Sequence, residues 1–256
     1  MNARVPKTAL VTGGAKRIGR AIVEDLHAHG FSVAIHANGS IGDAEELALD
    51  LSARGPKCVS VKADLAEPAA VVQMAKAAIE ALGPIGVLVN NASVFQDDEA
   101  QHFDEANFDR HFAVHLKAPL VLGEAVLDHL PEESEGLIVN LIDQRVWALT
   151  PRFFSYTLSK SSLWTATQTM AQAFAPRGIR VNAIGPGPTL PNARQEDADF
   201  RRQTQNLPLG YGPGLAEFGR TIRFLVETPS ITGQMIALDG GQHLAWETPD
   251  IADIPE

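Results

Sequence analysis

Tyr156 and Lys160 lie four residues apart, a spacing that places both side chains on one face of a helix. An ammonium group beside a phenol favours the phenolate, so we expect Lys160 to lower the pKa of Tyr156 from about 10 toward neutrality. A tyrosine of that kind can exchange a proton near pH 7 while a hydride moves. The pair therefore predicts a general acid/base centre built on Tyr156.

A glycine-rich turn near the start of the chain has the composition of a nucleotide site. The segment Thr12–Gly19 follows the apolar run Thr8–Thr12. It leads into a predicted helix, in which Ile18, Ile22 and Leu26 recur every four residues. Glycines at a strand-to-helix turn let backbone amides approach a pyrophosphate at the helix N-terminus. The turn predicts a dinucleotide site, and a purely structural turn is the alternative.

The end of the second apolar run indicates which dinucleotide binds. An acidic residue at that position would bind the ribose hydroxyls of NAD and repel a 2′-phosphate. The segment His36–Ser40 contains no acid, and Lys16 and Arg17 in the neighbouring turn can meet a phosphate. These residues favour NADP(H).

Two further segments follow predicted strands, at the sheet edge where open α/β folds bind ligands. Asp64 can accept a hydrogen bond from an adenine amino group, or it can serve as a helix N-cap. The segment Asn90–Ala92 follows the next run. We expect both segments to border the nucleotide.

Short apolar runs alternate along the chain with segments whose apolar residues recur with the period of an α-helix. This rhythm predicts one α/β domain over residues 1–256, a Rossmann fold with a doubly wound parallel sheet of about seven strands and helices on both faces. The expected strands are Thr8–Thr12, Ser32–His36, Cys58–Val61, Val87–Val89, Leu137–Leu141, Arg180–Ala183 and Met235–Leu238.

Two segments depart from this rhythm. Gly185–Leu209 contains four prolines and several charges, and we expect a long loop that closes over substrate as a lid. The last residues, Glu247–Glu256, carry two prolines and four acids and predict a surface tail.

The composition excludes several classes of partner. A net charge of −10 and a pI near 5.3 argue against nucleic-acid binding and against docking on anionic membranes. No apolar stretch approaches the ~18 residues of a membrane span, and no apolar leader precedes the first strand. A single cysteine, Cys58, cannot form an intrachain disulfide and predicts a core residue. We expect a soluble, cytoplasmic protein.

A metal site is not expected. His111 and His115 share a helical face, but no third ligand of suitable spacing accompanies them. We therefore expect no bound metal.

The motifs occur together in an order that resembles the short-chain dehydrogenase/reductase superfamily over nearly the whole chain. This resemblance implies a nicotinamide cofactor, Tyr156 as the general acid/base and Lys160 holding the nicotinamide ribose. The segments that carry it are Thr12-Gly13 with Gly19, Asp64, Asn90–Ala92, Tyr156 with Lys160, Pro186-Gly187 and Asp239–Gly241.

Three positions depart from that superfamily's usual pattern. Arg17 stands where a glycine is usual, Asp143 where a serine precedes the tyrosine by thirteen residues, and His115 where an asparagine is usual. At these three positions, and in the segments Asn91–Phe95 and Leu238–Leu244, the chain resembles the pteridine reductases and the related dihydromonapterin reductases.

That narrower resemblance implies roles for four residues. Arg17 would contact cofactor phosphate and pterin, Phe95 would stack on the pterin ring, and Asp143 would share proton delivery with Tyr156. We expect His115 to form hydrogen bonds, and one hypothesis is that it orders a water leading to Lys160. The alternatives are core packing for Phe95, a loop cap for Asp143 and a phosphate contact alone for Arg17.

The expected site residues are therefore as follows. The catalytic set is Tyr156, Lys160, Asp143 and His115, and the substrate set is Arg17, Ser93, Phe95, Asp143 and Tyr156. The cofactor set is Gly13, Lys16, Arg17, Ile18, Gly19, His36, Asn38, Ser40, Asp64, Leu65, Asn91, Ala92, Ser93, Tyr156, Lys160, Pro186 and Gly187.

The function expected from these residues is that of an NADPH-dependent reductase of a pterin-like small molecule. The alternatives are a carbonyl or alcohol oxidoreductase, a non-catalytic NADP-binding sensor, and a structural partner protein without nucleotide affinity. The superfamily resemblance also implies a homotetramer built from long helices around Phe108–Leu130 and Ser155–Phe174.

Overall fold

A parallel sheet of seven strands runs through the centre of the molecule. The computed structural model describes residues 5–191 and 196–245, and its strands follow the order β3-β2-β1-β4-β5-β6-β7. The fold class expected from the sequence is confirmed. The strands are β1 (Thr8–Val11), β2 (Ser32–Ala37), β3 (Cys58–Lys62), β4 (Val87–Asn90), β5 (Gly136–Leu141), β6 (Ile179–Pro186) and β7 (Met235–Leu238).

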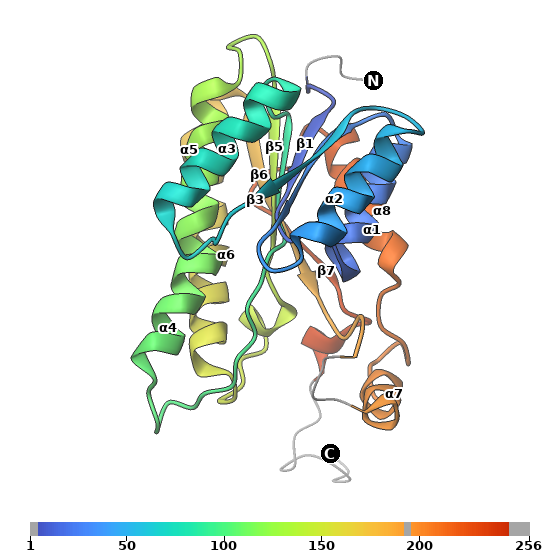
Figure 1. Ribbon diagram of the computed structural model, residues 1–256. Helices are drawn as coiled ribbons and strands as arrows, with labels where there is room; N and C mark the ends of the chain where they lie inside the picture. The colour runs from blue at the N-terminus through green and yellow to red at the C-terminus, as the bar shows by residue number, and fades with distance from the viewer. Residues whose placement is uncertain (1–4, 192–195, 246–256) are drawn as a thin grey trace, which may run out of the picture.

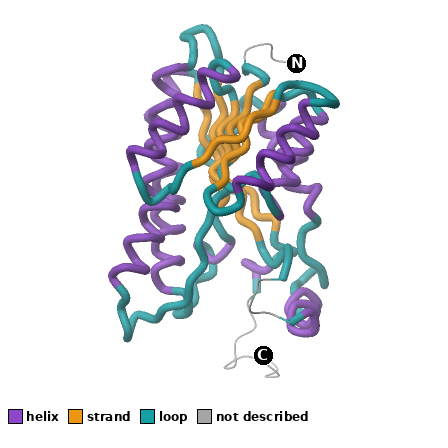
Figure 2. The backbone as a smooth tube through the Cα atoms, in the orientation of Figure 1, coloured by secondary structure: helices purple, strands orange, loops and turns teal. Residues whose placement is uncertain are grey.

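Helices cover both faces of the sheet, which explains why its central strands are continuous apolar runs (Figures 1 and 2). All six residues of β5 and all four of β4 are buried. One face carries α1 (Arg17–Ala28), α2 (Ile41–Ser52) and α8 (Leu215–Glu227). The other carries α3 (Pro68–Leu82), α5 (Ala118–His129) and α6 (Phe154–Phe174).

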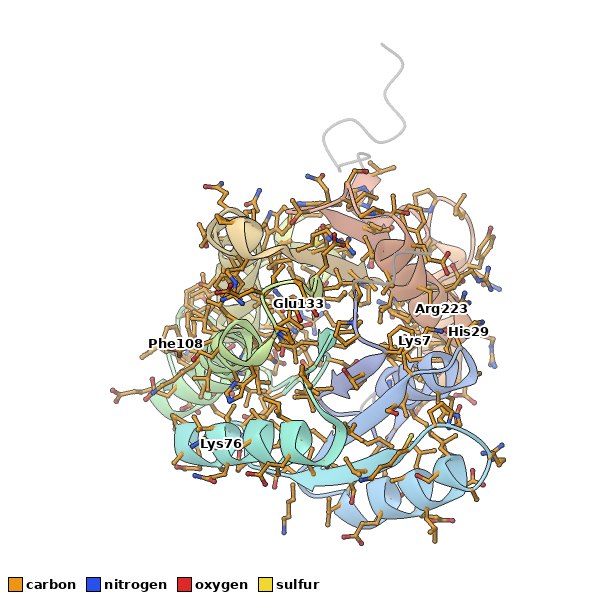
Figure 3. The ribbon with its side chains drawn as sticks, turned by 90° about the horizontal axis from the view of Figure 1, so that it is seen from above. Lys7, His29, Lys76, Phe108, Glu133 and Arg223 are labelled. Carbon is orange, nitrogen blue, oxygen red and sulfur yellow. The ribbon has the colours of Figure 1, made fainter. Side chains whose placement is uncertain are left out.

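The two faces have separate apolar cores. On the α1 and α8 side, Phe218 is fully buried, and the Arg223 guanidinium holds α8 to α1 through Asp25 at 2.7 Å. Figure 3 shows Arg223 and His29 together on this side, with Lys76 and Phe108 on the opposite side of the sheet.

The seven expected strands all form, with ends that differ by a few residues. The expected helix around Phe108–Leu130 is divided into α4 (Glu105–Phe112), a five-residue π turn η1 (Ala113–Lys117) and α5. Proline at the second position of α5 has no amide hydrogen to donate, which fits a break in the regular hydrogen-bond ladder before it. Cys58 is buried, as expected.

The expectation that Gly185–Leu209 is a loop throughout is wrong. Its first two residues complete β6, and α7 (Asp197–Gln205) forms inside it. Acidic residues occupy the first turn of α7 and Arg202 pairs with Asp199, so the charged residues favour a short helix here. The expected tail, Glu247–Glu256, lies outside the described residues. Within the described part of the chain, no helix is long and apolar enough to cross a membrane.

The strand order places a crevice between β1 and β4. These two strands pair directly, but the chain leaves them toward helices on opposite faces, α1 after β1 and α4 after β4. The loops at their carboxyl ends therefore diverge, and this topological switch point is where ligands bind in open α/β sheets.

Replacing Phe218 by alanine tests the core on the α8 side. We expect Phe218→Ala to lower the free energy of unfolding by about 3–5 kcal/mol, because a fully buried ring leaves a cavity. Denaturant unfolding measures this loss. The matched control is Phe224→Ala on the same helix, where the side chain is 48% exposed and the loss is much smaller. Equal losses for the two variants would contradict this packing.

Candidate active site

Two adjoining cavities open at the carboxyl edge of the sheet. The nucleotide cavity, about 390 Å³, lies beside the glycine-rich turn, and the substrate cavity, about 270 Å³, lies over Asp143 and Tyr156. Arg17, Ile18, Asn91 and Ser93 line both. Every residue of the expected cofactor and substrate sets lines one or both cavities.

The glycine-rich turn is held in place by side chains from neighbouring strands. The amide nitrogen of Gly13 donates to Nδ1 of His36 at 3.1 Å, and Nδ2 of Asn91 donates to the carbonyl oxygens of Thr12 and Gly13. A Cβ on Gly19 would lie 2.0 Å from the Gly13 carbonyl oxygen, so only glycine fits there. These contacts fix the backbone that a pyrophosphate would approach.

His36 and Asp64 have structural hydrogen bonds beside the nucleotide cavity. Nε2 of His36 donates to the carbonyl oxygen of Ala63, and burial lowers the pKa of His36, so the ring is neutral. Asp64 Oδ1 accepts from the amide of Ala66. The alternative that Asp64 is a helix N-cap is wrong, because Glu67 occupies that position before α3.

Lys16 and Arg17 point to different partners. Lys16 Nζ lies 3.0 Å from Asp43 Oδ2 at the start of α2. Arg17 has φ +53°, so its backbone keeps the left-handed conformation that a glycine adopts at low cost. Its guanidinium donates to the carbonyl oxygens of Leu190 and Pro191, across the mouth of the cavities. Arg17 therefore joins the glycine-rich turn to the segment after β6.

Tyr156, Asp143 and Lys160 meet at the wall of the substrate cavity. The Tyr156 hydroxyl donates to Asp143 Oδ2 at 2.9 Å. Asp143 Oδ1 accepts from the amide of Arg145, so this carboxylate caps its loop and also contacts the phenol. Lys160 Nζ donates to the carbonyl oxygen of Leu141 at 2.7 Å.

The expected effect of Lys160 on Tyr156 is wrong. Burial, followed by the Asp143 carboxylate, raises the pKa of Tyr156 well above its ordinary value. Burial also raises the pKa of Asp143, although Arg145 opposes that shift. Burial lowers the pKa of Lys160 to about 8. The phenol and carboxyl thus form a coupled pair that retains its proton.

Phe95 lies at the entrance to the same cavity. Its ring stacks on Phe153, with centroids 4.2 Å apart and planes at 19°, and meets the edge of Tyr156 at 4.8 Å. Phe153 precedes α6 in a left-handed conformation, with φ +56°. Phe95 is thus anchored on one aromatic neighbour while it lines the cavity.

His115 lies behind the site and lines neither of the two cavities. Its Nδ1 lies 2.8 Å from Ser159 Oγ, and its Nε2 accepts from the amide of Val94 at 3.1 Å and contacts Ser93 Oγ at 2.9 Å. Burial lowers the pKa of His115 well below its ordinary value, so these bonds involve the neutral ring. His115 ties the segment before Phe95 to α6.

His111 supports the same segment one turn earlier. Its Nδ1 donates to the Asn107 carbonyl oxygen at 2.8 Å, which leaves Nε2 to accept from the amide of Gln96 at 3.5 Å. No group of three or more potential metal ligands occurs among the described residues.

Sequence reasoning missed several residues that line the substrate cavity. Phe200 and Gln203 enter it from α7, which sequence reasoning treated as loop. Arg145 has a signal in the sequence, a basic residue two positions after Asp143 at the end of a predicted strand. Gln144 and Gln242 line the cavity with no comparable signal.

Known proteins resemble the chain along most of its length. The family model for short chain dehydrogenases matches residues 7–202. The alternative dihydrofolate reductase 1, FolM, of Brucella canis, in complex with NADP, is 60% identical over 96% of this chain and 97% of its own, with a TM-score of 0.93. The corresponding Brucella suis protein, also with NADP, is 59% identical over 96% and 98%, with a TM-score of 0.90.

A more distant relative is also a reductase. The 3-oxoacyl-[acyl-carrier-protein] reductase of Staphylococcus epidermidis is 30% identical over 93% of this chain and 99% of its own length.

Replacing His115 by alanine tests its contact with the segment before Phe95. We expect His115→Ala to increase hydrogen exchange at the Val94 amide, because that amide loses its buried acceptor. Hydrogen–deuterium exchange read at Val94 measures the effect. His129→Ala, an exposed histidine on α5, is the control. Unchanged protection of Val94 in His115→Ala would contradict the contact.

The lowered histidine pKa values predict an acid-sensitive fold. His36, His111 and His115 are neutral when folded, whereas an unfolded histidine takes up a proton near pH 6.5. The free energy of unfolding should therefore fall as the pH drops below 6.5, by about 1.4 kcal/mol per pH unit for each histidine that stays neutral. Urea unfolding between pH 5 and 7.5 measures the slope. His115→Asn should reduce it and His129→Asn should not.

Proposed function

Since the chain belongs to the short-chain dehydrogenase family, we propose that it is an NADPH-dependent reductase of a dihydropteridine-type small molecule. The observation that carries the proposal is the hydrogen bond from Tyr156 to Asp143 at the wall of a cavity bordered by Phe95. The Brucella relatives, each a dihydrofolate reductase in complex with NADP, support the same reaction class.

The nucleotide cavity fits NADP(H). Gly13 and Gly19 line it, and a Cβ on either residue would crowd the turn, so the close-packed backbone of the turn suits a pyrophosphate. The end of β2 presents His36, Asn38 and Ser40, with no acid to repel a 2′-phosphate. Lys16 and Arg17 line the same cavity and would supply positive charge there. Bound NADPH would supply the hydride.

The Tyr156–Asp143 pair supplies the proton. Reducing a ring C=N bond adds a hydride to carbon and a proton to nitrogen, and a raised pKa keeps a proton on the pair at neutral pH. Tyr156 would give its hydroxyl proton to the nitrogen while Asp143 stabilises the phenol oxygen or replaces that proton. Lys160 would hold the nicotinamide ribose and add positive charge beside the pair.

Phe95 positions the flat substrate. A pteridine ring in the substrate cavity can stack against Phe95, which lines that cavity beside Tyr156. Arg17 lines both cavities and can contact substrate and cofactor phosphate together. His115 would act through the Ser93–Phe95 segment and not on the substrate itself.

We also propose how the remaining parts of residues 1–256 serve this function. The 185–209 segment would cover the substrate, because Leu190, Phe200 and Gln203 line its cavity. Leu120 on α5 and Leu158 on α6 are exposed, which suits association of these helices in a homotetramer. A reducing cytoplasm suits NADPH chemistry and the unpaired Cys58.

Replacing Tyr156 by phenylalanine tests the proton donor. We expect Tyr156→Phe to lower kcat with NADPH and 7,8-dihydrobiopterin by about 10²–10⁴-fold, because the hydroxyl transfers the proton. NADPH binding, measured by fluorescence titration, should persist. Tyr211→Phe, at the chain's other and exposed tyrosine, is the matched control. A parent enzyme that reduces a ketone panel but no dihydropterin would contradict the proposed substrate class.

The Lys160 pKa of about 8 predicts the alkaline limit of the reaction. Loss of the ammonium proton above that pH removes the charge that stabilises developing negative charge on the Tyr156 oxygen. We therefore expect kcat for dihydropterin reduction to fall as the pH rises through about 8. A steady-state profile from pH 6.5 to 9.5 measures this, and a kcat that stays constant above pH 8 would contradict it.

A further inference from the structure

A third cavity adjoins the substrate cavity and shares no lining residue with the nucleotide cavity. It has a volume of about 330 Å³ and shares Gln144, Arg145 and Gln242 with the substrate cavity. Arg152 and Phe153 form part of its remaining wall. A ligand whose ring lies against Phe95 can therefore extend past Arg145 into this space.

The third cavity is basic, although the whole chain is acidic. Two arginines line it and none of its described lining residues is acidic, in a chain with a net charge of −10. Neither Arg145 nor Arg152 forms an ion pair with a carboxylate within the described ranges 5–191 and 196–245. A cavity with this charge selects an anion.

Arg145 has unused hydrogen-bonding capacity. Its Nη1 atom is buried and has no hydrogen-bond partner among the described residues. Its guanidinium carbon lies 5.1 Å from the ring centroid of Phe153, and that of Arg152 lies 5.9 Å from the same centroid. Contact with an aromatic ring restrains a guanidinium while its N–H edge can still bind an oxyanion.

We propose that this third cavity is an anion subsite, in which Arg145 and Arg152 bind a carboxylate or phosphate on the side chain of the dihydropteridine. The inference rests on the proposed function, because the ring must first occupy the substrate cavity. A guanidinium binds either oxyanion through paired, charge-assisted hydrogen bonds. An uncharged hydroxyalkyl side chain cannot neutralise two arginines, so the subsite favours anionic substrates.

Arg152 is the better position for a test. Arg145 also acts on the proton pair, because its charge lowers the pKa of both Asp143 and Tyr156. A change at Arg145 would therefore alter kcat for every substrate. Arg152 is exposed and contacts only the third cavity of the three. Its replacement should therefore alter discrimination between substrates more than proton transfer.

The experiment compares kcat/KM for three substrates with saturating NADPH. They are 7,8-dihydrofolate, which has two carboxylates, 7,8-dihydroneopterin monophosphate, and uncharged 7,8-dihydrobiopterin. We expect the parent enzyme to favour at least one anionic substrate, and Arg152→Gln to reduce that preference about tenfold, mainly through KM. Arg145→Gln should reduce it further and also lower kcat. Arg220→Gln, an exposed arginine on α8, makes the same charge change and should leave the preference unaltered.

The outcomes separate the subsite from the proposed function. A preference confined to dihydrofolate assigns the subsite to carboxylates, and one confined to the monophosphate assigns it to phosphates. Two results overturn the subsite while the enzyme still reduces all three substrates: the parent enzyme shows no preference for anionic substrates, or Arg152→Gln retains the parent's preference. Either result leaves the reductase proposal standing. If no dihydropterin is turned over, the reductase proposal fails. Calorimetric titration of the NADPH complex with p-aminobenzoylglutamate and with inorganic phosphate then decides the subsite, which fails if neither binds or if binding persists in Arg152→Gln.

Discussion

The hydrogen bond between Tyr156 and Asp143 joins the first turn of α6 to the loop after β5, and the geometry of the candidate site depends on it. Tyr156 is buried and Asp143 is half-buried, and desolvation raises the pKa of both groups, so the pair keeps its proton. The start of α6 is itself fixed, because Asp98 accepts hydrogen bonds from the amide and hydroxyl of Ser155. A carboxylate on the segment after β4 thus helps to position Tyr156.

Neutral histidines hold the loops around this pair. His36 accepts from the glycine-rich turn, while His111 and His115 accept from the amides on either side of Phe95. A protonated imidazole cannot accept a hydrogen bond, so burial, which keeps these rings neutral, also maintains the loop geometry. The cations of the site, among them Lys160, Arg17 and Arg145, line the cavities. The neutral histidines therefore hold the loops from behind, whereas charged lysine and arginine side chains line the cavities.

Much of the site could be predicted because the sequence patterns that indicate glycine-rich turns, strands and helices involve residues close together in the chain. The Thr12–Gly19 turn, the seven strands and the Tyr156–Lys160 spacing each depend on residues adjacent in the chain. The pKa of Tyr156 could not be predicted in this way. Sequence spacing suggested that Lys160 would lower it, but Lys160 donates to the Leu141 carbonyl oxygen, and burial with Asp143 raises it. Desolvation depends on every neighbour of a group, and most of those neighbours are distant in sequence.

The sequence by itself determined the order of the seven strands along the chain, the sheet edge at which polar residues collect, and the residue types that meet there. Periodicity and turn chemistry act over a few residues, so they can be read along the chain. Only the tertiary structure decided that Phe153 stacks on Phe95, that His115 lies behind the site, and that Arg145 and Arg152 line one cavity. Those contacts depend on how separate loops pack at the end of the sheet, which no local pattern specifies.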